Sequence, residues 1–214
     1  MIIRKQIIFD FDGVILKSHK VKSQAFYDLF SSYGKKISEK VLSYHLKNEG
    51  KSRFIKFKYI YKNILKEKIS KKKLDLLSEN FDAISLKKIN ELKIPKYLIY
   101  FLKKNKKKIL FHISTGTPQK IIEKILKKKK INHYFKNVYG SPAKKIVHIN
   151  KIKKNKKDTL FIGDSFEDFL SCKKTKTQFL LKMHNENKLK FKNLKVNKIK
   201  NFKNLENFLN KNFL

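Results

Sequence analysis

The chain has 214 residues, of which 41% are hydrophobic, so it is long enough for one sizeable domain, or a core with a smaller insertion, and global disorder is excluded. Lysine and arginine number 54 against 17 acidic residues, a formal net charge of +37. The excess is nearly all lysine, is spread along the chain, and comes without an RNA-binding signature. We therefore interpret it as a solvated basic surface that can attract anionic substrates, and we expect no dedicated nucleic-acid partner.

The lone cysteine, Cys172, excludes an intramolecular disulfide and a cysteine metal cluster. The first six residues do not have the pattern of a signal peptide, and no apolar stretch reaches about 18 residues. We therefore expect a cytoplasmic protein that does not engage a membrane.

The first predicted element is an apolar strand that ends in two carboxylates. Residues 6 to 13 read as a buried strand and a turn, with Asp10 and Asp12 on one side, because residues two apart in a strand point the same way. Two carboxylates about 4 Å apart repel by roughly 4 kcal/mol at an effective dielectric of about 20. This pair therefore favours a bound cation.

A long helical pattern follows. Apolar residues recur at spacings of three and four from about residue 21 to residue 90, with no convincing strand. This block is too long for one crossover connection, so we predict an inserted helical cap over residues 18–92 and a core formed by residues 1–17 and 93–214.

Strands and helices alternate after the cap. Helices are expected near residues 97–104, 119–129, 145–152 and 204–209, and strands near 109–113, 138–139, 159–164, 179–181 and 196–199. This alternation predicts an α/β core with a doubly wound, Rossmann-like parallel sheet.

Polar side chains follow two of the later strands. Ser114 and Thr115 end the second strand and Asp164 ends the third long one, and the carboxyl ends of parallel strands meet at one edge of a sheet. A hydroxyl before Gly116 can bind a phosphate oxygen together with nearby backbone amides. Asp164 would join the first two carboxylates, and oxygen-only ligands suit Mg²⁺.

Two further charged groups fit this edge. Asp168 returns to the same face if a helix begins near Ser165, and it can hold the site in place from behind. A lysine of the segment at 140–145 could balance the charge of a phosphate.

These features resemble the four ordered motifs of the haloacid dehalogenase superfamily. The matching segments are Asp10-Phe11-Asp12-Gly13-Val14, Thr115-Gly116, Lys145 after a Gly-Ser-Pro turn, and Gly163-Asp164-Ser165-Phe166-Glu167-Asp168. The helical insertion after the first motif resembles the C1-type cap of the phosphoglycolate phosphatase and β-phosphoglucomutase branch.

The resemblance implies a role for each motif residue. Asp10 would attack phosphorus and form an aspartyl-phosphate, and Asp12 would protonate the leaving alkoxide and then activate water. Thr115 would hydrogen-bond the phosphoryl group, and Lys145 would offset its charge. Mg²⁺ would be held by Asp10, the main-chain carbonyl of Asp12, and Asp164.

Two assignments have an alternative. Ser114 competes with Thr115, which we favour because it immediately precedes Gly116. Lys144 competes with Lys145, which we favour because related sequences place this lysine three residues after the proline.

The cap contains one segment with a substrate-binding pattern. Gly-x-Ser-Arg at 50–53 resembles the substrate-facing cap loop of related mutases and phosphatases, and Arg53 can grip a phosphate or carboxylate with two hydrogen bonds. Lys56 lies one turn further on the same face. An ordinary helix-start arginine is the alternative. Lys22 and His45 are further candidates. Of the remaining histidines, His112 is expected in the core, and the others are expected at the surface or in loops: His19, His133, His148 and His184.

The function we expect is a Mg²⁺-dependent phosphatase acting on a small phosphorylated metabolite, such as phosphoglycolate or a sugar phosphate. Dehalogenases of the superfamily that this chain resembles lack the second aspartate as acid and base, so Asp12 favours phosphoryl transfer over carbon–halogen cleavage. A sugar-phosphate mutase is the alternative, although Lys22 stands where β-phosphoglucomutases carry a histidine. A third hypothesis is a nucleic-acid-associated protein without enzymatic activity. The four intact motifs argue against it.

Overall fold

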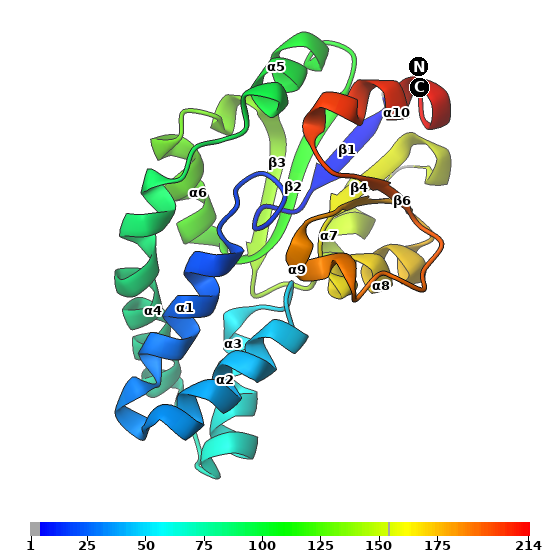
Figure 1. Ribbon diagram of the computed structural model, residues 1–214. Coiled ribbons are helices and arrows are strands. Elements are labelled where there is room, and N and C mark those ends of the chain that lie inside the picture. The colour runs from blue at the N-terminus through cyan, green and yellow to red at the C-terminus, as the bar shows by residue number, and fades with distance from the viewer. Residues whose placement is uncertain (1–4, 154) are drawn as a thin grey trace.

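The computed structural model describes residues 5–153 and 155–214, which form a parallel sheet with a helical bundle beside it (Figure 1). The strands are β1 (Gln6–Phe9), β2 (Leu110–Pro118), β3 (Phe135–Ser141), β4 (Thr159–Gly163), β5 (Gln178–Lys182) and β6 (Asn197–Ile199). The α-helices are α1 (His19–Leu29), α2 (Lys35–Lys47), α3 (Arg53–Tyr59), α4 (Lys71–Glu91), α5 (Lys96–Asn105), α6 (Gln119–Lys128), α7 (Lys145–Ile152), α8 (Phe166–Thr175), α9 (Asn185–Lys188) and α10 (Leu205–Asn212). A π-helix covers η2 (Ile60–Leu65), and short 3₁₀ helices cover η1 (Ser31–Tyr33), η3 (Asn132–Tyr134), η4 (Lys156–Asp158) and η5 (Phe202–Asn204).

The sheet has the strand order β3-β2-β1-β4-β5-β6, and all neighbouring strands run parallel. Phe9 of β1 pairs with Ile113 of β2 on one side and with Ile162 of β4 on the other. The carboxyl ends of these three strands are therefore level, so Asp10, Ser114 and Gly163 come next at one edge. The predicted α/β, Rossmann-like class is confirmed.

Helices cover both faces of the sheet because its strands are apolar on both sides. On one face, Ile7 and Phe9 belong to a core cluster that also includes Leu102 of α5, Ile122 of α6 and Leu209 of α10. On the other face, Ile8 packs with residues of α7 and α8 (Ile149, Ile152 and Cys172). Cys172 is thus a buried core residue.

The helices α1 to α4 form the predicted cap around a core of their own. Phe26 of α1, Val41 of α2, Phe57 of α3 and Phe81 of α4 belong to one buried cluster. The rings of Phe26 and Phe81 meet edge to face with centroids 5.0 Å apart. This bundle lies beside the carboxyl edge of the sheet (Figure 1). The cap is confirmed, whereas its boundaries at 18 and 92 stay a prediction.

Strand β2 is longer than the sequence predicts. It continues from Ile113 to Pro118, with a shift in its pairing to β3 between Ser114 and Pro118. The polar residues of this stretch do not alternate with apolar ones, so they carry no strand pattern. Among the described residues, a helix with the length and apolar character needed to cross a membrane does not occur.

Candidate active site

Three carboxylates meet at the carboxyl edge of the sheet. Asp10 follows β1, Asp164 follows β4, and Asp168 lies in the first turn of α8; one oxygen of each lies within 4.8 Å of the others. Asp10 and Asp168 are buried. Gly13, with φ at +80°, makes this closeness possible, because a Cβ there would lie 1.8 Å from Oδ2 of Asp164.

Burial and mutual repulsion disfavour the charged forms of these acids. Burial raises the pKa of Asp10 well above its usual value, and the neighbouring carboxylates add to this, although Lys145 acts in the opposite direction. Burial followed by repulsion from Asp168 raises the pKa of Asp164 in the same way. A group of close oxygen donors that repel one another fits a hard divalent cation such as Mg²⁺.

Lys145 lies in the middle of the acidic group. Its ammonium is 2.9 Å from Asp10 Oδ2 and 2.5 Å from Asp168 Oδ1. Burial lowers the pKa of Lys145, but these two carboxylates outweigh it and raise the pKa above the usual value. Lys144 is exposed. Of the two candidate lysines, Lys145 is the one that contacts Asp10.

Asp168 supports the site from behind. Its Oδ2 accepts hydrogen bonds from the backbone N–H of Ser165 (3.0 Å) and from the Ser165 hydroxyl (2.6 Å), which caps α8 in return. Its other oxygen binds Lys145. Asp168 therefore fixes both the lysine and the loop that follows Asp164.

The carboxylate of Asp12 points to different partners from those of Asp10. It accepts hydrogen bonds from Ser18 Oγ (2.5 Å) and Thr117 Oγ1 (2.9 Å), and an ion pair joins it to Lys22 of α1. Burial would raise the pKa of Asp12, but Lys22 and these hydrogen bonds lower it below its usual value. Lys22 also donates to Thr117 (2.7 Å).

Ser18 and Thr117 were not singled out by the sequence analysis. Both bind Asp12, from the linker into α1 and from the end of β2 respectively. Neither position carries a sequence signal of its own, because each reaches Asp12 through the tertiary fold.

The two hydroxyl candidates after β2 lie in different surroundings. Ser114 Oγ is 2.9 Å from His148 Nδ1 of α7, and both residues are buried. Thr115 Oγ1 accepts a hydrogen bond from the backbone N–H of Thr117 (3.2 Å). Gly116 and Thr117 line the cavity in front of the acids. The choice between Ser114 and Thr115 stays a prediction.

A cavity of about 70 Å³ lies between the acidic edge and the cap. The core contributes Asp10, Asp12 and Asp164, and the cap contributes its charged residues; the full lining is Asp10, Asp12, His19, Lys22, Phe26, His45, Glu49, Gly50, Lys51, Arg53, Lys56, Phe81, Gly116, Thr117 and Asp164. The cap loop touches the core closely, since a Cβ on Gly116 would lie 2.9 Å from the carbonyl oxygen of Gly50. The cap loop thus packs against the core at the edge of the cavity.

Arg53 lies in the cavity wall but is held by cap residues. Its Nη1 donates to Asp82 Oδ1 (2.5 Å) and to the carbonyl of Ser78 (3.2 Å), and its guanidinium lies 4.3 Å from the ring centre of Phe81. Binding of a substrate phosphate or carboxylate by Arg53 stays a prediction. Nη1 of its guanidinium is already bonded to Asp82.

Lys56 and His45 form a buried pair in the same wall. Lys56 Nζ is 3.1 Å from His45 Nδ1 and lies over the ring of Phe26. Burial lowers the pKa of Lys56 to about 7 and, with Lys56 adding to it, lowers that of His45 well below its usual value. Lys56 therefore changes charge near neutral pH.

The fold and this geometry agree with the family comparison. Residues 7–182 match the sequence model of the haloacid dehalogenase-like hydrolases. The chain belongs to this family. The comparison with curated proteins finds no match to this hydrolase.

Solved structures share the fold over nearly the whole length of this hydrolase. A predicted phosphoglycolate phosphatase from Haemophilus somnus has a TM-score of 0.70 at 15% identity, with 96% of this chain and 97% of that chain covered. A candidate β-phosphoglucomutase from Thermotoga maritima has a TM-score of 0.66 at 18% identity, covering 97% and 99%. A candidate hydrolase, YfnB from Bacillus subtilis, bound to magnesium, has a TM-score of 0.65 at 16% identity, covering 97% and 99%. At these identities the likeness shows the fold alone.

Proposed function

We propose that the protein is a Mg²⁺-dependent phosphatase that hydrolyses a small phosphomonoester through an aspartyl-phosphate on Asp10. The observation that carries the proposal is the position of Asp10, which lines the cavity, faces Lys145 and lies close to Asp164. This edge would present a carboxylate nucleophile, a cation and a metal-binding group to one bound phosphate.

The oxygen-only donor set fits Mg²⁺, with Asp10, the main-chain carbonyl of Asp12 and Asp164 as the residues that would hold it. When bound, the ion would supply a positive charge that stabilises the phosphoryl oxygens. The Lys145 ammonium would add a second positive charge beside Asp10. Thr115 would donate a hydrogen bond to the phosphoryl group.

Asp12 would act as the acid and then as the base. Its contacts with Lys22, Ser18 and Thr117 lower its pKa, so in this arrangement the carboxylate is ionised and ready to accept a proton from water. Donation to the leaving alkoxide requires a proton on Asp12. Loss of the Lys22 contact on substrate binding would favour that protonated form.

The cavity wall supports a small anionic substrate. Lys22, Arg53 and Lys56 line it from the cap side, and Lys22 also binds Asp12. We propose a compact metabolite, such as a phosphoglycolate-like or sugar-phosphate-like ester, because this cavity is lined from both the core and the cap. Closure by the cap would also keep bulk water from the reacting atoms.

A mutase is the alternative, favoured by the likeness to the candidate β-phosphoglucomutase. Lys22 binds Asp12 directly in this chain, at the position where the mutases carry a histidine. Incubation with hexose 1-phosphates, followed by measurement of released phosphate against isomer formed, separates the two activities.

Replacement of Asp10 by Asn tests the proposal. We expect Asp10→Asn to lower the turnover of p-nitrophenyl phosphate in excess Mg²⁺ by at least about three orders of magnitude, because the amide is a poor nucleophile. Asp75→Asn, an exposed carboxylate in α4, is the matched control and should keep full activity. Circular dichroism of both variants checks the fold. Near-native turnover by Asp10→Asn would show that another group attacks phosphorus.

A further inference from the structure

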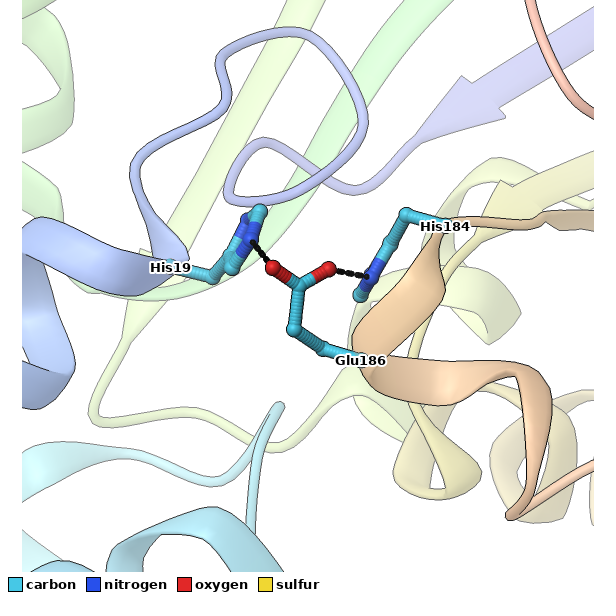
Figure 2. Close-up of side chains that lie close together, drawn as sticks. All are labelled: His19, His184 and Glu186. Carbon is cyan, nitrogen blue, oxygen red and sulfur yellow. Dashed lines mark hydrogen bonds and ion pairs between the residues drawn. The ribbon is translucent and has the colours of Figure 1, made fainter.

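A second group of metal-ligating side chains lies beside the acidic edge, where the chain enters the cap (Figure 2). It consists of His19, the first residue of α1, His184 in the loop after β5, and Glu186 of α9. One donor atom of each lies within 4.8 Å of the other two. The group therefore joins the beginning of the cap to a loop of the core.

Glu186 faces both imidazoles. Its Oε1 is 3.2 Å from Nε2 of His19, and its Oε2 is 2.9 Å from Nδ1 of His184. The two rings are stacked, with centroids 4.8 Å apart and planes 11° apart. Figure 2 shows the carboxylate between the two histidines, close to a ring nitrogen of each, and Nδ1 of His184 makes a hydrogen bond with it. Two nitrogens and a carboxylate thus lie close together, and a turn of one of the stacked rings would direct both nitrogen lone pairs at one ion.

Acidic groups lie on both sides of the His184 ring. Its Nε2 is 2.9 Å from Asp164 Oδ2, so a carboxylate faces each ring nitrogen. A neutral imidazole has one N–H and can satisfy one of the two acceptors. With that N–H on Nε2 and donated to Asp164, an ion at Nδ1 would complete the carboxylate–histidine–metal arrangement that orients many ligating histidines.

His19 has two buried ring nitrogens without a hydrogen-bond partner among the described residues. Both of its ring nitrogens are shielded from water, and neither makes a hydrogen bond of good geometry among the described residues. Polar atoms buried without a partner cost free energy, which a bond to a metal ion would recover. The nearby Lys20 Nζ lies 3.5 Å from Glu186 Oε1, but this lysine is exposed and solvated.

We propose that His19, His184 and Glu186 form a second divalent-metal site, which takes a transition metal of the Zn²⁺ class. Two imidazoles and a carboxylate are a common ligand set for zinc, whereas the acidic edge offers oxygens alone and suits Mg²⁺. An ion at this second site ties the first residue of α1 to the core. It also contacts Asp164 indirectly, through the ring of His184.

Titration of the full chain with Zn²⁺ in excess Mg²⁺, by calorimetry, tests the site. We expect binding at a single site, and Co²⁺ in its place should give the visible absorption of a nitrogen-ligated ion. His19→Ala and Glu186→Gln should each weaken Zn²⁺ binding by about tenfold or more. His133→Ala, an exposed histidine in η3, is the matched control and should bind Zn²⁺ as the wild type does. Lys20→Gln should bind equally or more tightly, because it removes a competing cation.

Asp10→Asn separates the two metal sites, and with them this proposal from the proposed phosphatase function. We expect this variant to lose phosphatase activity and to keep the Zn²⁺ affinity. Zn²⁺ binding that is lost in Asp10→Asn and kept in His19→Ala would place the ion at the acidic edge and overturn the proposal. Failure of the wild type to bind Zn²⁺ in excess Mg²⁺ would overturn it as well. Thermal unfolding of each variant confirms that the fold is intact.

Discussion

At the scale of single residues, the candidate site is a set of buried charges whose pKa values are moved by their neighbours. Lys145 stays charged because two carboxylates outweigh the effect of burial. Lys56 lies in the opposite situation, because its nitrogen contacts His45 and the Phe26 ring rather than a carboxylate. The pKa values of two lysines buried to a similar extent therefore move in opposite directions.

The buried charge of Lys56 should make the free energy of unfolding depend on pH. Its pKa is about 7 in the folded chain against an ordinary value of 10.5, so the unfolded chain binds more protons between these values and stability rises with pH across that window. Below about pH 7 the cost of burying the charge is fully present. We expect Lys56→Met to stabilise the protein by a few kcal/mol at pH 6, and this gain to shrink as pH rises from about 7 toward 10.5.

Chemical denaturation of Lys56→Met at several pH values measures this effect. Lys58→Met, two residues further along α3 and exposed, is the matched control and should change stability little at any pH. If Lys56→Met is no more stable than Lys58→Met at pH 6, the charge of Lys56 does not lower the free energy of unfolding.

At this scale the sequence predicts the acids better than their partners. Asp10 and Asp164 stand at the ends of apolar runs, so alternation and strand order bring them together. Thr117 binds Asp12 from a position 105 residues away, and the sequence around Thr117 gives no sign of it. His19 was expected at the surface, yet it packs against His184 from the other end of the chain. Such pairs depend on how the cap linker lies on the core, which local patterns do not contain.

At the scale of elements, the junction between the cap loop and the end of β2 forms part of the cavity wall. Gly116 of β2 lies under the loop before α3, and a Cβ on it would be 2.9 Å from Gly50 O and 3.2 Å from Lys51 O. These are backbone atoms, so the loop would have to move. Gly50 itself has φ at +83°, and a Cβ there would lie 2.2 Å from Ser165 Oγ. The loop can therefore pack this closely against the core because Gly50 and Gly116 have no side chains.

Gly116→Ala should hold the cap loop away from the core. We expect KM for p-nitrophenyl phosphate to rise by about tenfold with a smaller change in stability, since misplacing positioning groups by about 1 Å can cost up to a hundredfold. Gly34→Ala is the control. Gly34 has φ at +90° and open space around it, so alanine there strains the backbone and lowers the melting temperature without raising KM. An unchanged KM for Gly116→Ala would mean that the loop does not shape the substrate site.

The elements themselves were largely predictable, because their apolar patterns are strong. The expected helix at 145–152 coincides with α7, and the expected strand at 159–164 contains β4. The extension of β2 to Pro118 was missed, since pairing with β3 rather than an apolar pattern holds it. The π-helix at Ile60–Leu65 was missed for a similar reason, because its apolar spacing resembles that of an ordinary helix.

At the scale of the whole molecule, the formal charge of +37 acts on both stability and substrate capture. Like charges spread over one compact chain repel one another and destabilise the folded state. The same field would attract the anionic substrate of the proposed phosphatase toward the cavity, where Lys22 and Lys56 line the wall. Salt should weaken both effects, because the screening length falls from about 30 Å at 0.01 M to about 8 Å at 0.15 M ionic strength.

Raising the salt concentration should therefore move stability and catalytic efficiency in opposite directions. We expect the melting temperature to rise when the NaCl concentration is raised from about 0.01 M to about 0.15 M. Over the same range, we expect kcat/KM for a dianionic phosphomonoester to fall several-fold. A short RNA should compete with substrate at low salt and lose its effect at the higher concentration, as expected of a non-specific basic surface. RNA that still binds tightly at the higher salt concentration, with kcat/KM independent of salt, would instead indicate a dedicated nucleic-acid site on this surface.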